Sequence, residues 1–307
     1  MAEKRKVEII GAPVGIASGS IGASLGPDSI RLAGLHESLA RLKRPYDDNG
    51  NVTTPLEEPY PPKDYQIGQI RYLNEILDFQ NELHDIVTKA YNRGSMPLVL
   101  GGDHSVAIGS ISATIKYFKK QGVEPGVIWF DAHADLNTEE TSPSGNIHGM
   151  PLAIALGKGN QSLCKLFEDN FLSPRRTVIV GVRSVDSEEA DIIRELGVRI
   201  FTMKDLDEMG AANCFRRALR IASPKGEPIH LSFDIDGVDE RFVPGTGTPV
   251  SGGTTIREAH LLLEMIAESG VLAAMDMVEV NPLLDHCNST AKLALELIQS
   301  ALGKVIY

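Results

Sequence analysis

The sequence predicts a single α/β domain over residues 1–307, built as a three-layer α/β/α structure with a mainly parallel sheet. Two observations predict this fold class. Short apolar runs of strand length alternate with segments of helical periodicity along the chain, and this alternation is typical of a parallel sheet covered by helices on both faces. In addition, no linker, repeat or low-complexity tract divides the chain.

The expected elements follow one another along the chain. Apolar runs predict strands at 7–10, 97–100, 127–130, 177–182, 199–202, 229–233 and 274–280. Apolar residues at helical spacing, or flanking turn residues, predict helices at 29–42, 72–91, 105–120, 187–196, 213–222, 255–269 and 290–302. Residues 44–66 are rich in Pro, Asp and Asn, and we predict a polar connection there, the least structured part of the chain.

The glycine-rich segment 11–27 suggests a phosphate-binding loop at first sight. It contains neither GxGxxG nor GxxxxGKS, so we interpret it as an ordinary surface or active-site loop.

Composition narrows the possible partners and the cellular compartment. A formal net charge of -11 argues against a nucleic acid or an anionic membrane as the main partner. The three cysteines, Cys164, Cys214 and Cys287, are scattered and form no CxxC pair, which fits a reducing compartment. The N-terminus has no long apolar segment and no stretch reaches membrane-spanning length, so we expect a cytoplasmic protein.

Three potential metal ligands, Asp131, His133 and Asp135, follow the predicted strand 127–130. Each of them alone could be a turn-capping or otherwise hydrogen-bonded polar residue. As a trio after an apolar strand they favour metal binding, because unpaired buried carboxylates are costly and a cation is the usual remedy.

Polar motifs occupy the ends of four predicted strands, at 102–105, 131–135, 234–236 and 279–282. Ligands of open α/β sheets bind at the carboxyl ends of strands, so we expect the four motifs to share one crevice. Four carboxylates and two histidines, without a thiolate, favour hard or borderline divalent ions and are too many for one catalytic zinc. Two ions would lower the pKa of a bridging water, which makes hydrolysis the expected reaction class.

The motifs GGDHS, DAHADLNTEETSPSGNIHGMP, SFDIDGVDERFVPGTGTPVSGG and MVEVNP together resemble the ureohydrolase (arginase/agmatinase) family, and the second is most similar to the arginases. The resemblance runs from GASLGPDSIRLAGL to NSTAKLALELIQSALG, essentially the whole chain. It implies an arginase-like fold and, as activity, hydrolysis of L-arginine to L-ornithine and urea by a hydroxide that bridges two Mn²⁺ ions per subunit. The same ligands could hold cobalt, nickel or iron instead.

The family pattern also implies roles for individual residues. One ion would be held by His104, Asp131, Asp135 and Asp234, and the other by Asp131, His133, Asp234 and Asp236, with Asp131 and Asp234 as bridges. Asp135 would also pass a proton to the departing amine, His148 would be a proton shuttle, and Glu279 would pair with the guanidinium. Thr248 matches a pocket position of the family.

Substrate choice within the family is expected to depend on the loop after Asp135 and on the segment 186–189. Asn137, Ser144 and Asn146 match residues that bind the α-carboxylate, and Asp186 and Glu189 match the acids that hold the α-amino group. These matches favour L-arginine over agmatine, which has no carboxylate. The residues alone favour turn positions for Asn137 and Ser144, and Asp186 could be a helix cap, which is compatible with binding.

Two other hypotheses remain open at this stage. The chain could be an agmatinase or another guanidino-acid ureohydrolase, or a metal-binding protein that keeps the fold without turnover. The complete set of six ligands with His148 and Glu279 argues against the second. Arg257 and Glu258 match family positions at a subunit contact, and they predict a homotrimer or a hexamer of two trimers.

Overall fold

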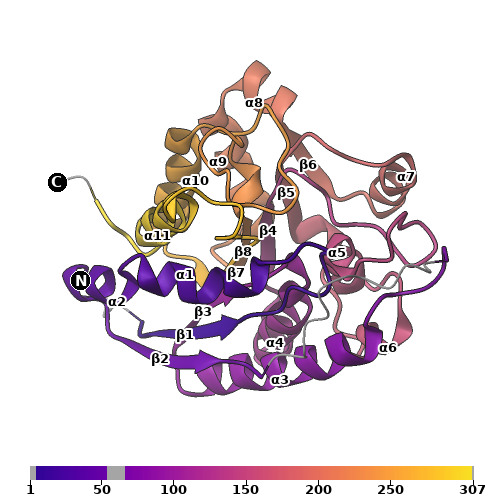
Figure 1. The fold of residues 1–307 in the computed structure, drawn as a ribbon, viewed down its shortest axis with the longest axis horizontal. Coiled ribbons are helices and arrows are strands. Elements are labelled where there is room, and N and C mark those ends of the chain that lie inside the picture. Colours follow the sequence, from indigo (N-terminus) through magenta and orange to yellow (C-terminus); the bar gives the residue numbers. More distant parts are fainter. Residues whose placement is uncertain (1–4, 54–65, 306–307) are drawn as a thin grey trace.

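The computed structural model describes residues 5–53 and 66–305, which form one eight-stranded sheet with helices on both faces (Figure 1). All strand pairs are parallel, in the order β2-β1-β3-β8-β7-β4-β5-β6. The predicted three-layer α/β class with a parallel sheet is therefore confirmed. The strands are β1 (Val7–Ala12), β2 (Tyr46–Asn51), β3 (Met96–Gly101), β4 (Gly126–Phe130), β5 (Thr177–Val182), β6 (Arg199–Thr202), β7 (Ile229–Asp234) and β8 (Leu272–Val278).

The central strands are mainly apolar because they are buried on both faces. In β4, Ile128 and Phe130 belong to one hydrophobic core, whereas Val127 and Trp129 belong to the other. Successive side chains of a strand point to opposite faces, so one apolar run of five residues supplies both cores.

Two layers of helices cover the sheet (Figure 1). Their apolar faces pack against the strands, which is what the helical spacing of the sequence predicts. One face packs against α1 (Gly26–Leu32), α2 (Leu35–Arg41), α8 (Met203–Met209), α9 (Ala211–Ala222), α10 (Ile256–Ser269) and α11 (Ser289–Ala301). The other packs against α3 (Leu73–Asn92), α4 (Ala107–Lys119), α5 (Pro151–Ala155), α6 (Gln161–Cys164) and α7 (Ser187–Leu196).

Two expectations about the N-terminal part are wrong. Residues 46–51, expected within the polar connection 44–66, form the edge strand β2, which pairs with β1. A polar sequence suffices here because an edge strand faces water, and Arg31 of α1 holds Asp48 through two hydrogen bonds of 2.8 and 2.9 Å. Residues 54–65 of that connection lie outside the described part of the chain. The expected helix 29–42 is divided at Gly34, whose φ is +104°.

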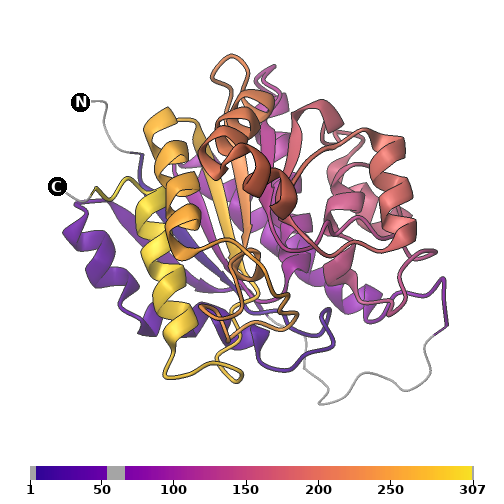
Figure 2. The same ribbon diagram turned by 90° about the horizontal axis from the view of Figure 1, so that it is seen from above.

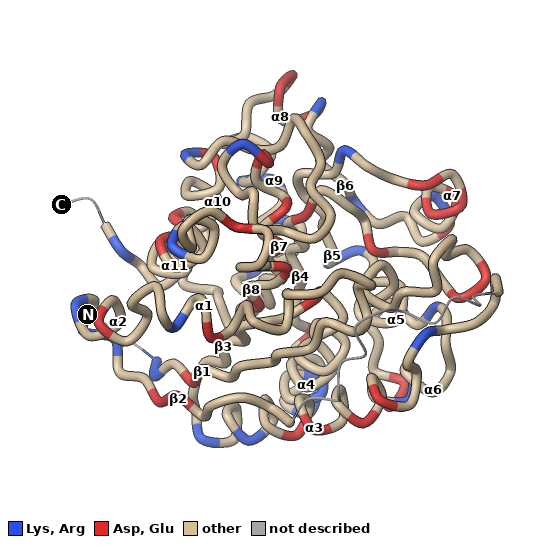
Figure 3. Tube along the Cα trace, viewed as in Figure 1, with Lys and Arg blue, Asp and Glu red and all other residues tan. Residues whose placement is uncertain are grey.

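The parallel arrangement brings the carboxyl ends of the strands to one edge of the sheet. Figure 2 shows the indigo segment after β1 and the orange and yellow segments after β7 and β8 gathered there. In Figure 3, acidic residues lie at the centre of the fold, around the labels of β3, β4, β7 and β8. None of the helices within residues 5–53 and 66–305 is long and apolar enough to cross a membrane.

Candidate metal centre and substrate pocket

His104 enters the site from the end of β3. Gly102 makes this possible, because the Cβ of any other residue there would lie 1.7 Å from the carbonyl oxygen of Val14. The His104 ring stacks on Trp129, with centroids 4.0 Å apart, and its Nε2 lies 2.9 Å from Ser232 Oγ. Both contacts leave Nδ1 directed at the acidic cluster.

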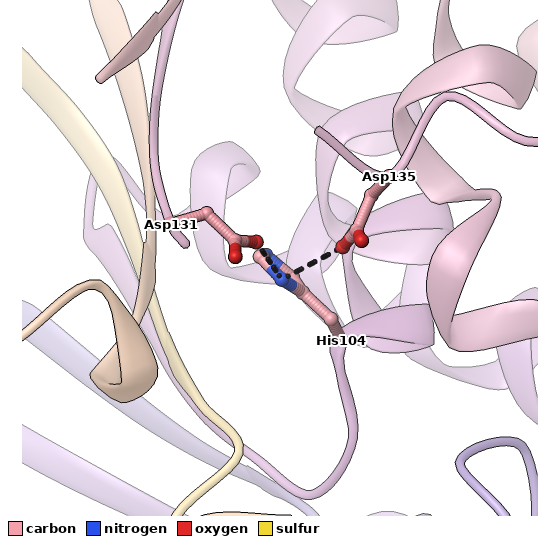
Figure 4. Close-up of side chains that lie close together, drawn as sticks. All are labelled: His104, Asp131 and Asp135. Carbon is pink, nitrogen blue, oxygen red and sulfur yellow. Dashed lines mark ion pairs between the residues drawn. The ribbon is translucent and has the colours of Figure 1, made fainter. Parts of the chain in front are cut away.

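Three carboxylate oxygens converge on His104 Nδ1. Asp131 Oδ2 lies at 3.0 Å, and Asp135 Oδ2 and Asp234 Oδ2 each lie at 3.1 Å. Figure 4 shows the first two approaching the ring from opposite sides. Despite these distances, Nδ1 is buried without a hydrogen-bond partner in the described part of the chain. An orphaned ring nitrogen facing three buried carboxylates is a donor set that suits a divalent cation.

A second cluster adjoins the first through Asp131. His133 Nδ1 lies 3.2 Å from Asp236 Oδ2 and 3.4 Å from Asp131 Oδ1. Asp131 thus offers one oxygen to each histidine. His104, Asp131 and Asp135 form one group able to hold a metal ion, and Asp131, His133 and Asp236 form another. The donor sets fit two hard or borderline ions side by side.

The carboxylates of the cluster lie close together around the same two histidines, His104 and His133. Burial and the neighbouring Asp131 raise the pKa of Asp135 to about 6. Burial and the nearby Asp236 and Asp131 also raise the pKa of Asp234 well above its ordinary value. Burial would raise the pKa of Asp131 as well, but its pairing with His104 and His133 lowers it. Bound cations would relieve this repulsion, which is a second reason for regarding the cluster as a metal centre.

Hydrogen bonds from the surrounding fold orient the carboxylates. Trp129 Nε1 donates to Asp131 Oδ2 at 2.9 Å. Asp236 accepts from the main-chain N–H of Ala132 at Oδ1 (3.2 Å) and from Thr248 Oγ1 at Oδ2 (3.1 Å), and its own N–H donates to Asp234 Oδ1 (2.8 Å). These hydrogen bonds therefore fix the orientation of the carboxylates without the help of a bound ion.

Glu279 lies beside the metal cluster, at the end of β8. Its Oε1 accepts from the main-chain N–H of His104 at 3.0 Å and lies 3.1 Å from His148 Nδ1. Its Oε2 is buried and has no hydrogen-bond partner within the described residues. Burial favours a neutral imidazole, but the hydrogen bond and charge of Glu279 raise the pKa of His148 to about 9.

The backbone at this edge is strained at two positions that line the site. Asp135 has φ +51° and Glu279 has φ +62°, and non-glycine residues rarely adopt this left-handed region. Such strain persists only where the surrounding structure imposes it, and it concentrates at functional sites.

A cavity of about 170 Å³ opens over the cluster. Its lining contains twelve of the fourteen site residues predicted from the sequence, namely His104, His133, Asp135, Asn137, Ser144, Asn146, His148, Asp186, Glu189, Asp234, Thr248 and Glu279. The other two, Asp131 and Asp236, are buried beneath the lining and contact His104 and His133. The structure thus brings all fourteen together in one site.

The predicted carboxylate-binding and amine-binding residues also hold the local structure together. Asn137 Nδ2 donates to Asp186 Oδ2 at 3.3 Å, which links the two halves of the expected α-amino-acid subsite. Glu189 accepts from the main-chain N–H of Leu136 at 2.8 Å and from that of Asp186 at 3.4 Å. Asp186 is the N-cap residue of α7. Helix capping does not exclude substrate binding, because both side chains also line the cavity.

The loop 142–146 lines the cavity and is held by hydrogen bonds between side chains and the main chain. The main-chain N–H of Asn146 donates to Ser144 Oγ at 3.2 Å, and Asn146 Nδ2 donates to the carbonyl of Ser18 at 3.0 Å. The Asn146 amide nitrogen is therefore used to hold the glycine-rich segment, which lies against the site as a loop.

Sequence reasoning missed several residues of the site. Ser142 and Ser184 line the cavity, and Ser232 contacts the metal-binding candidate His104. Ser142 lies in the same TSPSGN run as Ser144, and Ser184 lies two residues before Asp186. Ser232 carries no comparable signal, because it lies within an apolar strand.

The fold and site together define a protein with paired His/Asp metal-binding groups and a small polar pocket at the carboxyl edge of a parallel sheet. The arginase family model matches residues 5–303, so the chain belongs to the arginase family. An arginase of Bacillus subtilis (strain 168) is 41% identical over 98% of each chain.

Two solved structures show the same architecture. The arginase of Bacillus caldovelox has a TM-score of 0.93 and 39% identity, covering 99% of this chain and 100% of the other. The Entamoeba histolytica arginase in complex with L-ornithine has a TM-score of 0.89 and 33% identity, covering 98% and 99%. The resemblance seen in the sequence motifs is confirmed.

Proposed function

We propose that this protein is an arginase that hydrolyses L-arginine to L-ornithine and urea. The observation that supports it most is the unpartnered Glu279 Oε2 next to the buried His/Asp cluster. A carboxylate oxygen that no described residue contacts by a hydrogen bond, in the same cavity as groups able to hold metal ions, suits a cationic substrate whose reacting carbon must lie close to the metals. The similarity to arginases over the whole chain supports the same proposal.

We assign two Mn²⁺ ions to the cluster. His104, Asp131, Asp135 and Asp234 would hold one, and Asp131, His133, Asp234 and Asp236 the other. When bound, such a pair lowers the pKa of water and so supplies a nucleophile at neutral pH. The absence of thiolates from the ligand set favours manganese over softer metals, and metal analysis decides between manganese, cobalt, nickel and iron.

The remaining side chains bind the substrate and transfer protons. Glu279 pairs with the guanidinium and holds it beside the ligand cluster, with Oε2 as the free acceptor. His148, whose Nδ1 is engaged by Glu279, exchanges protons at Nε2. Asp135, a ligand of the first ion, also carries a proton to the departing amine.

We infer that the far end of the cavity selects an amino acid rather than a decarboxylated amine. Asn137, Ser144 and Asn146 supply neutral donors for an α-carboxylate, and Asp186 and Glu189 supply carboxylates for an α-ammonium. Agmatine would leave the first group without a partner, which is the situation in which polar sites discriminate most strongly.

Urea release tests the proposal directly. The purified, manganese-reconstituted protein is offered L-arginine, agmatine and guanidinobutyrate in parallel, and metal content is measured on the same sample. Strong preference for L-arginine with two ions per chain is expected. Preference for agmatine or guanidinobutyrate would assign the chain to another ureohydrolase activity, and metal binding without urea release would overturn enzymatic function.

We also propose a cytoplasmic homotrimer or homohexamer with neither nucleic acid nor membrane as partner. The free thiols of Cys164, Cys214 and Cys287 support a reducing compartment. Within one chain, Arg257 donates to Glu264 at 2.9 Å, and Glu258 accepts from the main-chain N–H of Thr255 at 2.8 Å. Sedimentation of the purified protein distinguishes the trimer from the hexamer.

A further inference from the structure

Arg183, the first residue after β5, places its guanidinium among main-chain carbonyls next to the metal-binding candidates. Nη2 donates to the carbonyls of Asp236 and Val250, both at 2.7 Å, and Nε donates to Val250 at 3.1 Å. Longer bonds of 3.4 Å join the side chain to the carbonyls of Gly237 and Val238. One side chain thereby holds both ends of the loop 238–253, which carries Thr248.

Arg183 is connected to Asp236 in two ways, directly through its side chain and indirectly through Ala132. The main-chain N–H of Arg183 donates to the carbonyl of Ala132 at 2.9 Å. The N–H of Ala132 donates to Asp236 Oδ1 at 3.2 Å, and the carbonyl of Asp236 accepts from the Arg183 side chain. The ends of β4, β5 and β7 are joined in this way, and the other Asp236 oxygen, Oδ2, is left facing His133 at 3.2 Å.

The chemistry of arginine suits this position better than that of lysine. A guanidinium has five N–H donors in a planar fork, whereas an ammonium has three donors around a point. Within the described part of the chain, every hydrogen bond of the Arg183 side chain goes to a main-chain carbonyl. Its effect on the site is therefore on the geometry of the chain that carries the ligand.

We propose that Arg183 is a positioning residue that sets the aim of the Asp236 carboxylate, and so the affinity of the metal subsite formed by Asp131, His133 and Asp236. This inference deepens the proposed function and depends on its assignment of two metal ions. Residues that orient metal ligands from behind change metal affinity by about 10- to 100-fold when altered.

The test is Mn²⁺ binding by equilibrium dialysis to the full chain, with Arg183→Lys and Arg183→Gln as variants. Arg176→Lys is the matched control, because Arg176 lies just before β5 at the opposite end of the same strand and its side chain is 19% exposed. The expected result is that the Arg183 variants bind one of the two ions about 10- to 100-fold less tightly and the other within twofold. Saturating Mn²⁺ restores their kcat.

A double-mutant cycle locates the effect. In a His133→Asn background, which already lacks a ligand of the subsite, Arg183→Lys is expected to add little further loss. In a His104→Asn background its full effect is expected to remain, because His104 belongs to the other group.

Three results would overturn the inference or separate it from the proposed function. Unchanged affinities for both ions in the Arg183 variants would overturn it. Equal loss of both ions, with a lowered melting temperature of the metal-free variants, would make Arg183 a purely structural residue and overturn it too. A wild-type chain that binds only one ion would refute the dinuclear assignment. In that case, unchanged affinity for the single ion in the Arg183 variants would overturn the inference, and weaker affinity would support it.

Discussion

The main-chain N–H of His104 donates to Glu279 Oε1 at 3.0 Å, joining two residues 175 positions apart in the sequence. The bond connects the end of β3, which supplies a metal-ligand candidate, to the end of β8, which supplies the proposed guanidinium partner. Because one Glu279 oxygen is fixed by the fold, the other is left in a defined direction for the substrate.

Glu279→Gln is expected to weaken catalysis without removing the metals. The glutamine carbonyl can still accept from His104, but the negative charge facing the guanidinium is lost. A hydrogen bond to a charged group contributes about 1.5–3 kcal/mol, so kcat/KM for L-arginine should fall by about 10- to 150-fold. Steady-state kinetics with parallel metal analysis measures this, and Glu268→Gln at an exposed position of α10 is the control. Loss of metal in Glu279→Gln would contradict the assignment.

Asn137→Ala is expected to lower kcat/KM for L-arginine by about tenfold or more, because one donor to the α-carboxylate disappears. Turnover of agmatine, which has no carboxylate, should change much less. Comparing the two substrates on one enzyme preparation separates specificity from general damage. Asn81→Ala, whose side chain bonds only within α3, is the matched control. A normal kcat/KM for L-arginine in Asn137→Ala would refute our account of the carboxylate subsite.

Asp131→Ala is expected to remove both metal ions, whereas His104→Asn should affect mainly one. The reason is that Asp131 faces both histidines, at 3.0 and 3.4 Å, while His104 belongs to a single group. Metal counts after dialysis, together with residual urea release, distinguish the two variants. Equal metal content and equal residual activity in both would argue against a bridging Asp131.

The stability of the metal-free protein is expected to fall in acid partly through Glu8. Hydrogen bonds from Arg93 lower the pKa of buried Glu8 from 4.5 to about 2, against the opposing effect of burial. A folded-state pKa below the unfolded value gives stability that is present above about pH 4.5 and is lost as the pH falls through about 2. Denaturant unfolding at pH 6 and at pH 3 should show a smaller difference between wild type and Glu8→Gln at pH 3. An equal difference in unfolding free energy between the two proteins at pH 6 and at pH 3 would rule out this contribution.

Much of the fold could be predicted because its strands and helices carry strong local patterns. The run 177–182 predicts β5 with the bounds that the structure gives, and 187–196 does the same for α7. The strand β2 escaped prediction because its residues are polar and its pairing with β1 is set by the backbone. Local periodicity contains no information on such an edge strand.

The residues of the candidate site likewise divide into those that the sequence predicts and those that it does not. Residues such as Asp131 and His133 could be proposed because their motif follows a strand and matches a family pattern. Arg183 and Ser232 could not, since one acts through main-chain carbonyls and the other lies inside an apolar strand. Contacts that orient a metal-ligand residue depend on tertiary packing, and the spacing of motifs in the sequence contains no information on them.

The strand order also determines when the site can exist during synthesis. β8 pairs with β3 on one side and with β7 on the other, so without it the sheet would be two separate halves, β2-β1-β3 and β7-β4-β5-β6. His104 belongs to the first half, and Asp131, His133 and Asp236 all belong to the second. The pairing of β4 with β7 places His133 and Asp236 on neighbouring strand ends without β8, whereas only β8 links the strand that carries His104 to that half. The two candidate metal groups therefore depend on different lengths of chain, and the His104 group is complete only once the last strand has joined the sheet.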